Sequence, residues 1–235
     1  MRRDGELSPL RRMRTVASAL GVQTVALPQL VRGRRAAAAD WAPVAPDSVL
    51  CRSALEEARQ TLTPAVLAHS LRCWEFATAL AELDELRPDP EALYLACVLH
   101  DIGLGAPDDP RTGCFALLGA HRARAFVVDN GATEAVGDCV HTAIARHFDP
   151  VTPREHGAEA VLLHDAAHLD VVGVRAGDLE PGVLGAVHAR HPRAGFRGEF
   201  ADAMRHETRV RPHSTAATLW RTGMPLALAV NPLDR

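Results

Sequence analysis

The chain reads as a series of apolar runs with helical periodicity, separated by short polar loops that contain proline or glycine. The strongest run, TPAVLAHSLRCWEFATALAEL at 63–83, offers Thr63 as the N-cap and Pro64 in the first turn of a helix. Similar patterns predict helices over 46–62, 89–101, 114–131, 133–148 and 154–173, and a last helix around Glu199 to Arg209. Alternating patterns typical of strands are almost absent, so we predict an all-α helical bundle.

The first 46 residues differ from the rest of the chain. They are rich in Arg and Ala, contain Pro28, Pro43 and Pro46, and show little sustained periodicity. We therefore predict a loosely packed N-terminal extension over residues 1–46 and a helical domain over residues 47–235. Within that domain, the proline- and glycine-containing segment HARHPRAGFRGEF at 188–200 is expected to be mostly loop before the last helix.

Composition excludes several classes of function. All 26 basic residues are Arg, which excludes a Lys nucleophile, a Schiff base and a Walker-type phosphate loop. The net charge of −3 and the absence of aromatics among the N-terminal arginines argue against a nucleic-acid partner. No apolar run is long enough for a membrane span, and five cysteines without CxxC spacing fit a reduced, cytoplasmic protein. A homo-oligomer is left open.

The segment LACVLHDIGLG at 95–105 carries the strongest chemical signal. His100 and Asp101 end an apolar helix just before Gly103, so both side chains are expected to face the core. An unpaired imidazole and carboxylate there would cost on the order of several kcal/mol, and a divalent cation would satisfy both. A helix cap or a buried ion pair is the alternative. His69 in the 63–83 helix and Asp170 in the apolar segment LDVVG could complete a site of N and O ligands.

With these residues the sequence resembles the HD superfamily of metal-dependent hydrolases, whose signature is a His, an adjacent His-Asp pair and a distant Asp on successive helices. The segments HSLRCWEFA, VLHDIG, FALLGAHRARAFV and AIARH resemble the cyanamide hydratase-like branch, over about residues 50–175. The resemblance implies an HD-domain helical bundle that holds one divalent metal ion, zinc before iron or manganese. The implied ligands are His69, His100, Asp101 and Asp170.

The resemblance also implies the activity. We expect a metal-dependent hydrolase or hydratase in which a metal-bound water attacks a small-molecule substrate. Asp101 is expected to move a proton and His147 to face the substrate. From their positions near His69 and His147, Arg72 and Arg146 are candidates to bind an anionic group of the substrate, such as phosphate or carboxylate. The alternatives are a phosphohydrolase acting on a nucleotide-like phosphate monoester, a di-iron oxygenase, and a catalytically silent binding module that keeps the HD fold.

Two further histidine groups compete as metal sites. A dinuclear site would add His121 and His147, but Phe115 stands where relatives with two metals have their first extra ligand, which favours one metal. In HDAAH at 164–168, His164 and His168 share a helix face as in zinc proteases, but Asp replaces the required Glu. We expect that motif to be solvated helix surface.

Overall fold

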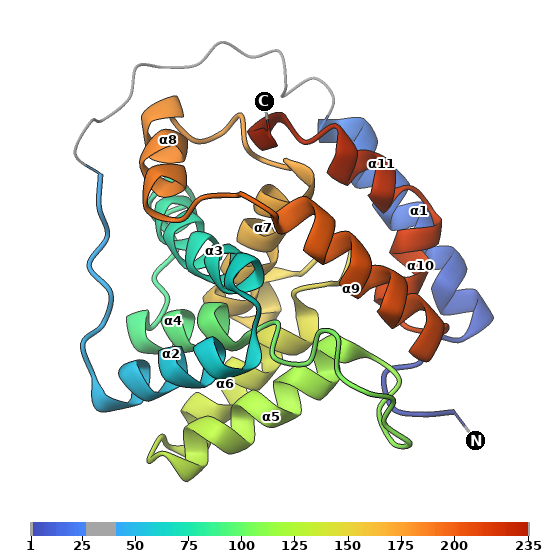
Figure 1. Ribbon diagram of the computed structural model, residues 1–235, viewed down its shortest axis with the longest axis horizontal. Helices are drawn as coiled ribbons and strands as arrows, with labels where there is room; N and C mark the ends of the chain where they lie inside the picture. The colour runs from blue at the N-terminus through green and yellow to red at the C-terminus, as the bar shows by residue number, and fades with distance from the viewer. Residues whose placement is uncertain (1, 27–40, 235) are drawn as a thin grey trace.

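The computed structural model describes residues 2–26 and 41–234, which form helices joined by short loops (Figure 1). The predicted segments fold as α2 (Val49–Thr61), α3 (Pro64–Leu83), α4 (Pro90–Leu99), α5 (Phe115–Asp129), α6 (Glu134–Arg146) and α7 (Ala158–Val172). The described residues form no strand, and their single isolated bridge joins Asp4 to Thr112. The all-α prediction is confirmed. No helix in this part of the chain has both the length and the apolar character that spanning a bilayer requires.

Side-chain caps fix where the helices begin. The oxygens of Ser48, Thr63, Asp89 and Thr133 each accept the backbone N–H three residues further on. These bonds satisfy donors that the first turn of a helix leaves free, so polar residues in front of apolar runs mark the helix starts in the sequence. Gly173 ends α7 in the left-handed conformation, with φ of 78°.

The C-terminal part contains more helix than the sequence predicted. It forms α8 (Pro181–Arg190), α9 (Phe196–Val210), α10 (Thr215–Arg221) and α11 (Met224–Ala229), and single 3₁₀ turns, η2 and η3, lie at Arg154–His156 and Pro232–Asp234. The expectation of loop at His188 was wrong, because this residue lies in α8. Helices of six to ten residues are stabilised by packing on the core more than by their own propensity, so periodicity gives little warning of them.

The N-terminal extension contains a helix that the sequence did not predict. This helix, α1 (Pro9–Ala26), packs against α10 at the edge of the bundle (Figure 1). Ahead of it, Arg3 pairs with Glu6 at 2.9 Å, and the backbone of Asp4 bonds to that of Arg111 and Gly113 in the loop after α4. Residues 27–40 of the predicted extension lie outside the described residues, and the boundary at residue 46 stays a prediction.

Two apolar clusters form the core. The larger one lies among α3, α4, α6 and α7 and includes Leu80, Leu95, Ile144 and Leu162. The smaller one lies under α9, α10 and α11 and is rich in aromatic rings, namely Phe115, Phe148, Phe196 and Phe200. His69 of α3 and His147, which follows α6, contact rings of the smaller cluster, so a buried polar centre lies at the junction of the two.

Gly103 allows the backbone after α4 to lie directly against α5. A Cβ atom at Gly103 would come within 2.3 Å of the Phe115 carbonyl oxygen and 2.6 Å of the Gly119 nitrogen. Both neighbours are backbone atoms, which cannot rotate away as a side chain can. The close approach fixes the backbone just after His100 and Asp101, which lie three and two residues before Gly103.

A buried ion pair holds the other end of the same loop. Glu207 and Arg211 of α9 are fully buried and joined at 2.6 Å. The Glu207 carboxylate accepts the Phe115 N–H at 3.2 Å, while Arg211 donates to the carbonyls of Ala106 and Pro107. This ion pair at the end of α9 thus fastens the segment between α4 and α5 at its middle and at its junction with α5.

We predict that Gly103→Ala lowers the free energy of unfolding by about 1–3 kcal/mol, because the added methyl group collides with backbone that cannot move. Gly185→Ala in α8 is the matched control, since a Cβ there meets open space and helix propensity favours Ala. Urea unfolding of both variants checks this. Equal stability of the two variants would contradict it.

Candidate metal centre

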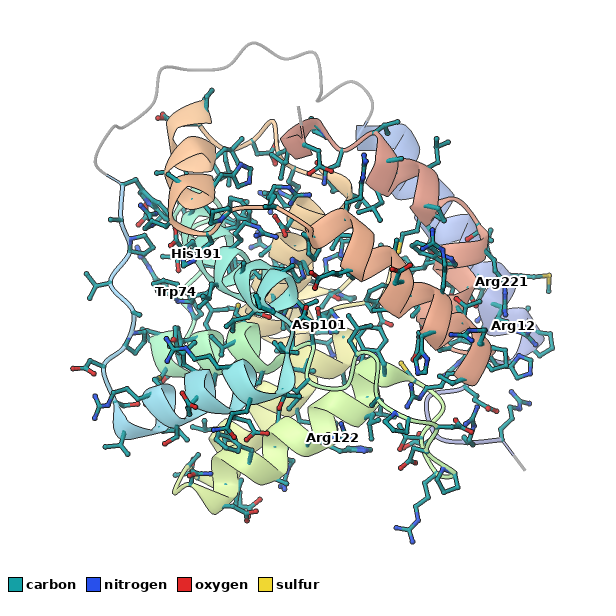
Figure 2. The ribbon with its side chains drawn as sticks, viewed as in Figure 1. Arg12, Trp74, Asp101, Arg122, His191 and Arg221 are labelled. Carbon is teal, nitrogen blue, oxygen red and sulfur yellow. The ribbon has the colours of Figure 1, made fainter. Side chains whose placement is uncertain are left out.

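Four polar side chains from three parts of the chain meet inside the bundle. His69 lies on α3, His100 and Asp101 follow α4 directly, and His147 follows α6. Each is at most 2 % exposed. Asp101 lies near the middle of the molecule (Figure 2). We call these four residues the polar centre.

Each imidazole of the polar centre is fixed by an acceptor at Nδ1. His100 and His147 cap their helices, and their Nδ1 atoms lie 2.8 Å and 2.6 Å from the carbonyl oxygens of Cys97 and Ile144, three residues back. His69 Nδ1 lies 2.6 Å from the Asp170 carboxylate. These acceptors assign the proton of each neutral ring to Nδ1. In each of the three rings, the Nε2 lone pair is therefore free to accept a hydrogen bond or to bind a cation.

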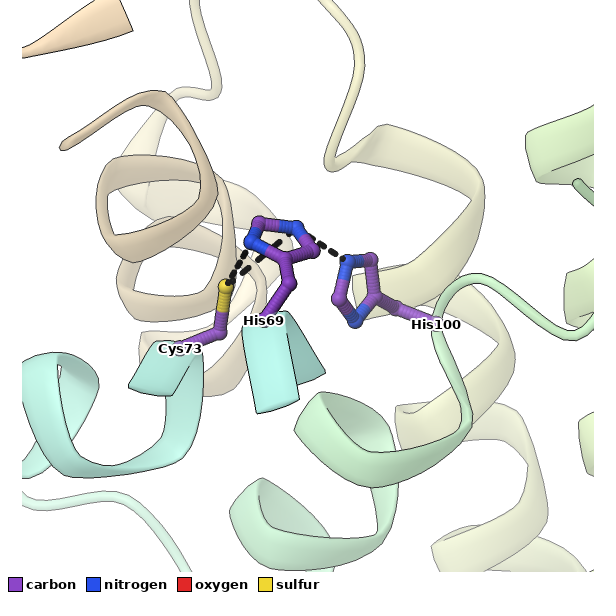
Figure 3. A group of neighbouring side chains, drawn as sticks. All are labelled: His69, Cys73 and His100. Carbon is purple, nitrogen blue, oxygen red and sulfur yellow. Dashed lines mark hydrogen bonds between the residues drawn. The ribbon is translucent and has the colours of Figure 1, made fainter. Parts of the chain in front are cut away.

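Three of these ligand atoms have the spacing of a metal site. His69 Nε2 and His100 Nε2 are 3.2 Å apart (Figure 3). Asp101 Oδ2 lies 3.3 Å from His100 Nε2 and 3.8 Å from His69 Nε2. Ligands on one tetrahedral zinc ion are separated by about 3.3–3.5 Å. The spacing fits a divalent cation bound between the two imidazoles and the carboxylate.

Two atoms of the polar centre are buried without a partner. Asp101 Oδ2 and His147 Nε2 have no hydrogen bond to the described residues, although native proteins rarely leave such groups unsatisfied. His147 Nε2 lies 3.7 Å from Asp101 Oδ1, the other oxygen of the same carboxylate. A cation bound to Asp101 Oδ2 and a water hydrogen-bonded to His147 Nε2 would satisfy both atoms.

The pKa values of the polar centre follow from burial and from the neighbouring charges. Burial opposes ionisation of Asp101, but the neighbouring imidazoles, His100 above all, outweigh it and hold its pKa below the usual range. Burial likewise opposes protonation of His100, and Asp101 outweighs it and raises the His100 pKa. Burial and the nearby His100 lower the pKa of His147 to about 3. A proton on His100 thus balances Asp101 when no cation does so.

Asp170 lies behind His69 and not among the Nε2 atoms. Its Oδ1 accepts from Arg72 Nε at 2.9 Å and Arg193 Nη1 at 2.5 Å, and its Oδ2 accepts from Arg72 Nη2 at 2.8 Å and His69 Nδ1. Asp170 therefore lies beside the polar centre, but it contacts His69 at Nδ1, the nitrogen that points away from His100. This placement differs from the predicted ligand set, because both carboxylate oxygens are already engaged.

Neither arginine predicted to bind substrate is placed to do so. Arg72 is fully buried, and besides Asp170 it donates to the carbonyls of His191 and Pro192. Arg146 is exposed and pairs with Asp149 at 3.2 Å. The predictions for both residues are therefore corrected: one guanidinium supports Asp170, and the other forms a surface ion pair.

Cys73 lies next to the polar centre as a thiol. Its Sγ atom is 3.6 Å from both Nδ1 and Nε2 of His69, as Figure 3 shows. Equal distances place the sulfur against the ring and not on the axis of the Nε2 lone pair. Burial raises the pKa of Cys73 well above its usual value, so without a cation the sulfur stays a thiol. Cys73 could hold a metal ion with His69 and His100, but its position against the ring makes the Asp101 oxygen the better-placed third donor.

The competing histidine groups lie elsewhere. His121 is exposed and stacks on His141, with ring centroids 5.2 Å apart, so it does not join His147 in a second metal site. His164 bonds to Asp165 at 2.8 Å and to the Asp149 carbonyl at 2.9 Å, and it is only 8 % exposed. The expectation of solvated surface was wrong for His164, because these partners bury it.

Sequence reasoning missed the aromatic rings around the polar centre and one of its arginines. His69 stacks on Phe196 of α9, with ring centroids 4.7 Å apart, and His147 contacts Phe115 and Phe148 edge-on. Arg193, which binds Asp170, lies in the turn before α9. Phe196 and Arg193 fall beyond the segments that carried the family resemblance, and no local pattern distinguishes them from ordinary core and surface residues.

Comparisons with known proteins agree with this geometry. Residues 66–166 match the HD domain family, and this range includes the whole polar centre. Two curated proteins of Saccharomyces cerevisiae, the cyanamide hydratases DDI2 and DDI3, are each 28 % identical over 178 residues, which cover 74 % of this chain and 79 % of theirs. The His, the His-Asp pair and the second His that converge inside this all-α bundle all lie in the part of the chain that matches the HD domain, and the chain is similar in sequence to hydratases over most of its length.

Proposed function

We propose that the chain is a metal-dependent hydratase of a small uncharged substrate of the cyanamide type. The observation that carries the proposal is the convergence of His69 Nε2, His100 Nε2 and Asp101 Oδ2 on one point, with the unpartnered His147 Nε2 beside it. The similarity to two cyanamide hydratases supports the choice of substrate.

In this proposal His69, His100 and Asp101 hold one zinc ion. Two nitrogens and one oxygen leave a position open, as catalytic zinc sites require. When bound, the ion supplies a water of lowered pKa and an electrophilic point for the substrate. Asp170 orients His69 through Nδ1, and carboxylates behind metal-binding imidazoles commonly have this role.

His147 is the proposed catalytic base. Its neutral Nε2 accepts the proton of the nucleophilic water as the C–O bond forms at the nitrile carbon, and it then returns a proton to the nitrile nitrogen. The bond order between carbon and nitrogen falls by one, and tautomerisation of the isourea gives urea. The Nδ1–H bond to Ile144 holds the ring in the tautomer that this step needs.

The surroundings favour an uncharged substrate over a phosphate monoester. Phe115, Phe148 and Phe196 contact the histidines of the polar centre. The charges of the adjacent Arg72 and Arg193 are balanced by Asp170 and Asp234. A phosphate would need a cationic group of its own, which these ion pairs do not offer.

We predict that the purified protein binds about one zinc per chain and that His69→Ala, His100→Ala and Asp101→Ala each remove it. Asp170→Asn should weaken zinc binding about 10- to 100-fold. His147→Ala should keep the metal and lower kcat by about 10²- to 10⁴-fold. Elemental analysis and chelator competition measure these effects. His141→Ala is the control, because this half-buried residue stacks on His121 outside the polar centre. Loss of zinc from His147→Ala would make His147 a ligand instead.

We predict that zinc binding weakens as the pH falls through the raised pKa of His100. Below that pKa the ion must displace the proton, so Kd should rise up to about tenfold per pH unit, while above it Kd should level off. The depressed pKa of Asp101 keeps this carboxylate ionised throughout. Competition with a chromophoric chelator from about pH 5.5 to 8.5 gives the curve. A Kd independent of pH would mean that no proton is displaced.

We predict that the zinc-loaded protein converts cyanamide to urea, that a chelator abolishes the activity, and that added zinc restores it. Colorimetric detection of urea measures the reaction. The aryl phosphate 4-nitrophenyl phosphate should remain intact, because the charges of the two guanidinium groups beside the polar centre are already balanced by carboxylates. Phosphate release that disappears in His100→Ala would favour the phosphohydrolase alternative.

A further inference from the structure

A narrow route leads from the polar centre toward the surface. His147, His168 and Met224 are among the residues that line a hollow of about 20 Å³. A second hollow, of about 50 Å³, shares His168, Val172 and Met224 with the first and reaches Ala19 of α1. Because the two hollows share walls, they adjoin. The route is lined by residues of α7, α10 and α11 and of the turns beside them, and α11 packs against both of the other helices.

Most of the side chains that line this route are apolar. Besides His147 at the inner end, its polar side chains are His168 and Thr222. The Thr222 hydroxyl donates to the Thr218 carbonyl at 2.8 Å. His168 Nδ1 lies 2.9 Å from the His164 carbonyl oxygen, which assigns the proton to Nδ1 and leaves Nε2 as an acceptor. Among the described residues, no group donates a hydrogen bond to that Nε2.

The His168 ring is held in place before any ligand arrives. It packs on the ring of His164, with centroids 4.1 Å apart, in addition to its backbone bond. His164 is in turn fixed by Asp165 and by the Asp149 carbonyl, and Arg175 binds Asp165 at 2.6 Å. An acceptor that is oriented in advance loses little freedom when it binds a ligand, so it discriminates well between ligands.

We propose that this route is the substrate entrance and that His168 determines specificity by accepting a hydrogen bond from an N–H group of the substrate at Nε2. The inference rests on the proposed function and adds a substrate class to it: small uncharged molecules that carry an N–H donor beside the carbon under attack. The narrow hollows exclude nucleotides, and the lone pair disfavours anions. A substrate without the N–H leaves the acceptor unpaired in an apolar wall.

The test compares His168→Leu with His168→Gln in zinc-loaded protein, using cyanamide and dimethylcyanamide, which lacks the N–H. In His168→Leu, kcat/KM for cyanamide should fall about 10- to 100-fold, mainly through KM, while the value for dimethylcyanamide should not change. His168→Gln keeps an acceptor oxygen and should restore part of the loss. His141→Leu is the matched control and should behave as the wild type. An equal loss for both substrates would make His168 merely structural and overturn the proposal.

A second variant tests the route itself. Met224→Trp should narrow the shared wall and lower kcat/KM for both substrates, while zinc content and helicity stay as in the wild type. Unchanged kinetics in a folded, zinc-loaded variant would place the entrance elsewhere.

A binding measurement separates failure of this inference from failure of the proposed function. Calorimetric titration of cyanamide into zinc-loaded wild type and His168→Leu needs no turnover. Weaker binding to the variant supports the role of His168 even if the wild type forms no urea. Equal affinity, or no binding to either protein, overturns it.

Discussion

The buried carboxylate of Asp170 is the contact on which the rest of the structure depends. Two guanidinium groups and one imidazole bind its oxygens, and the Asn231 side chain donates to its backbone carbonyl at 2.8 Å. It thereby joins α3, α7, the turn before α9 and the end of the chain. Removing one partner from a buried ion pair typically costs about 3–5 kcal/mol, because it leaves a charge without compensation. The orientation of His69 depends on this same carboxylate.

The polar centre is stable inside the protein because its groups are satisfied in two ways. The Nδ1 atoms of the three rings use carbonyl or carboxylate acceptors supplied by the helices, so this half of each ring never depends on a ligand. The Nε2 side of the rings faces Asp101, and there the negative charge is balanced by a proton on His100 or by a cation. A centre built in this way keeps its geometry without an ion, and phenylalanine rings pack against two of its imidazoles.

The sequence was sufficient for whatever depends on neighbours along the chain. Caps such as Thr63 and Asp89 marked the helix starts, and the apolar run before His100 and Asp101 indicated that both are buried. The sequence was insufficient where a side chain can pair with any of several residues that are distant along the chain. Arg72 could have bound a ligand, but it binds Asp170, 98 residues away. The short helices α10 and α11 and the stacking of Phe196 on His69 also arise only from tertiary packing.

The position of Arg193 has a consequence for the order in which the chain folds. This residue links Asp170 to Asp234, and Asn231 binds Asp170 as well. Helices α2 to α7 can form from nearby contacts, but these anchors of Asp170 lie well beyond α7 in the sequence. During synthesis, His69, His100 and His147 therefore emerge before the residues that hold Asp170. The orientation of His69 becomes fixed only when this later segment has folded back onto α7.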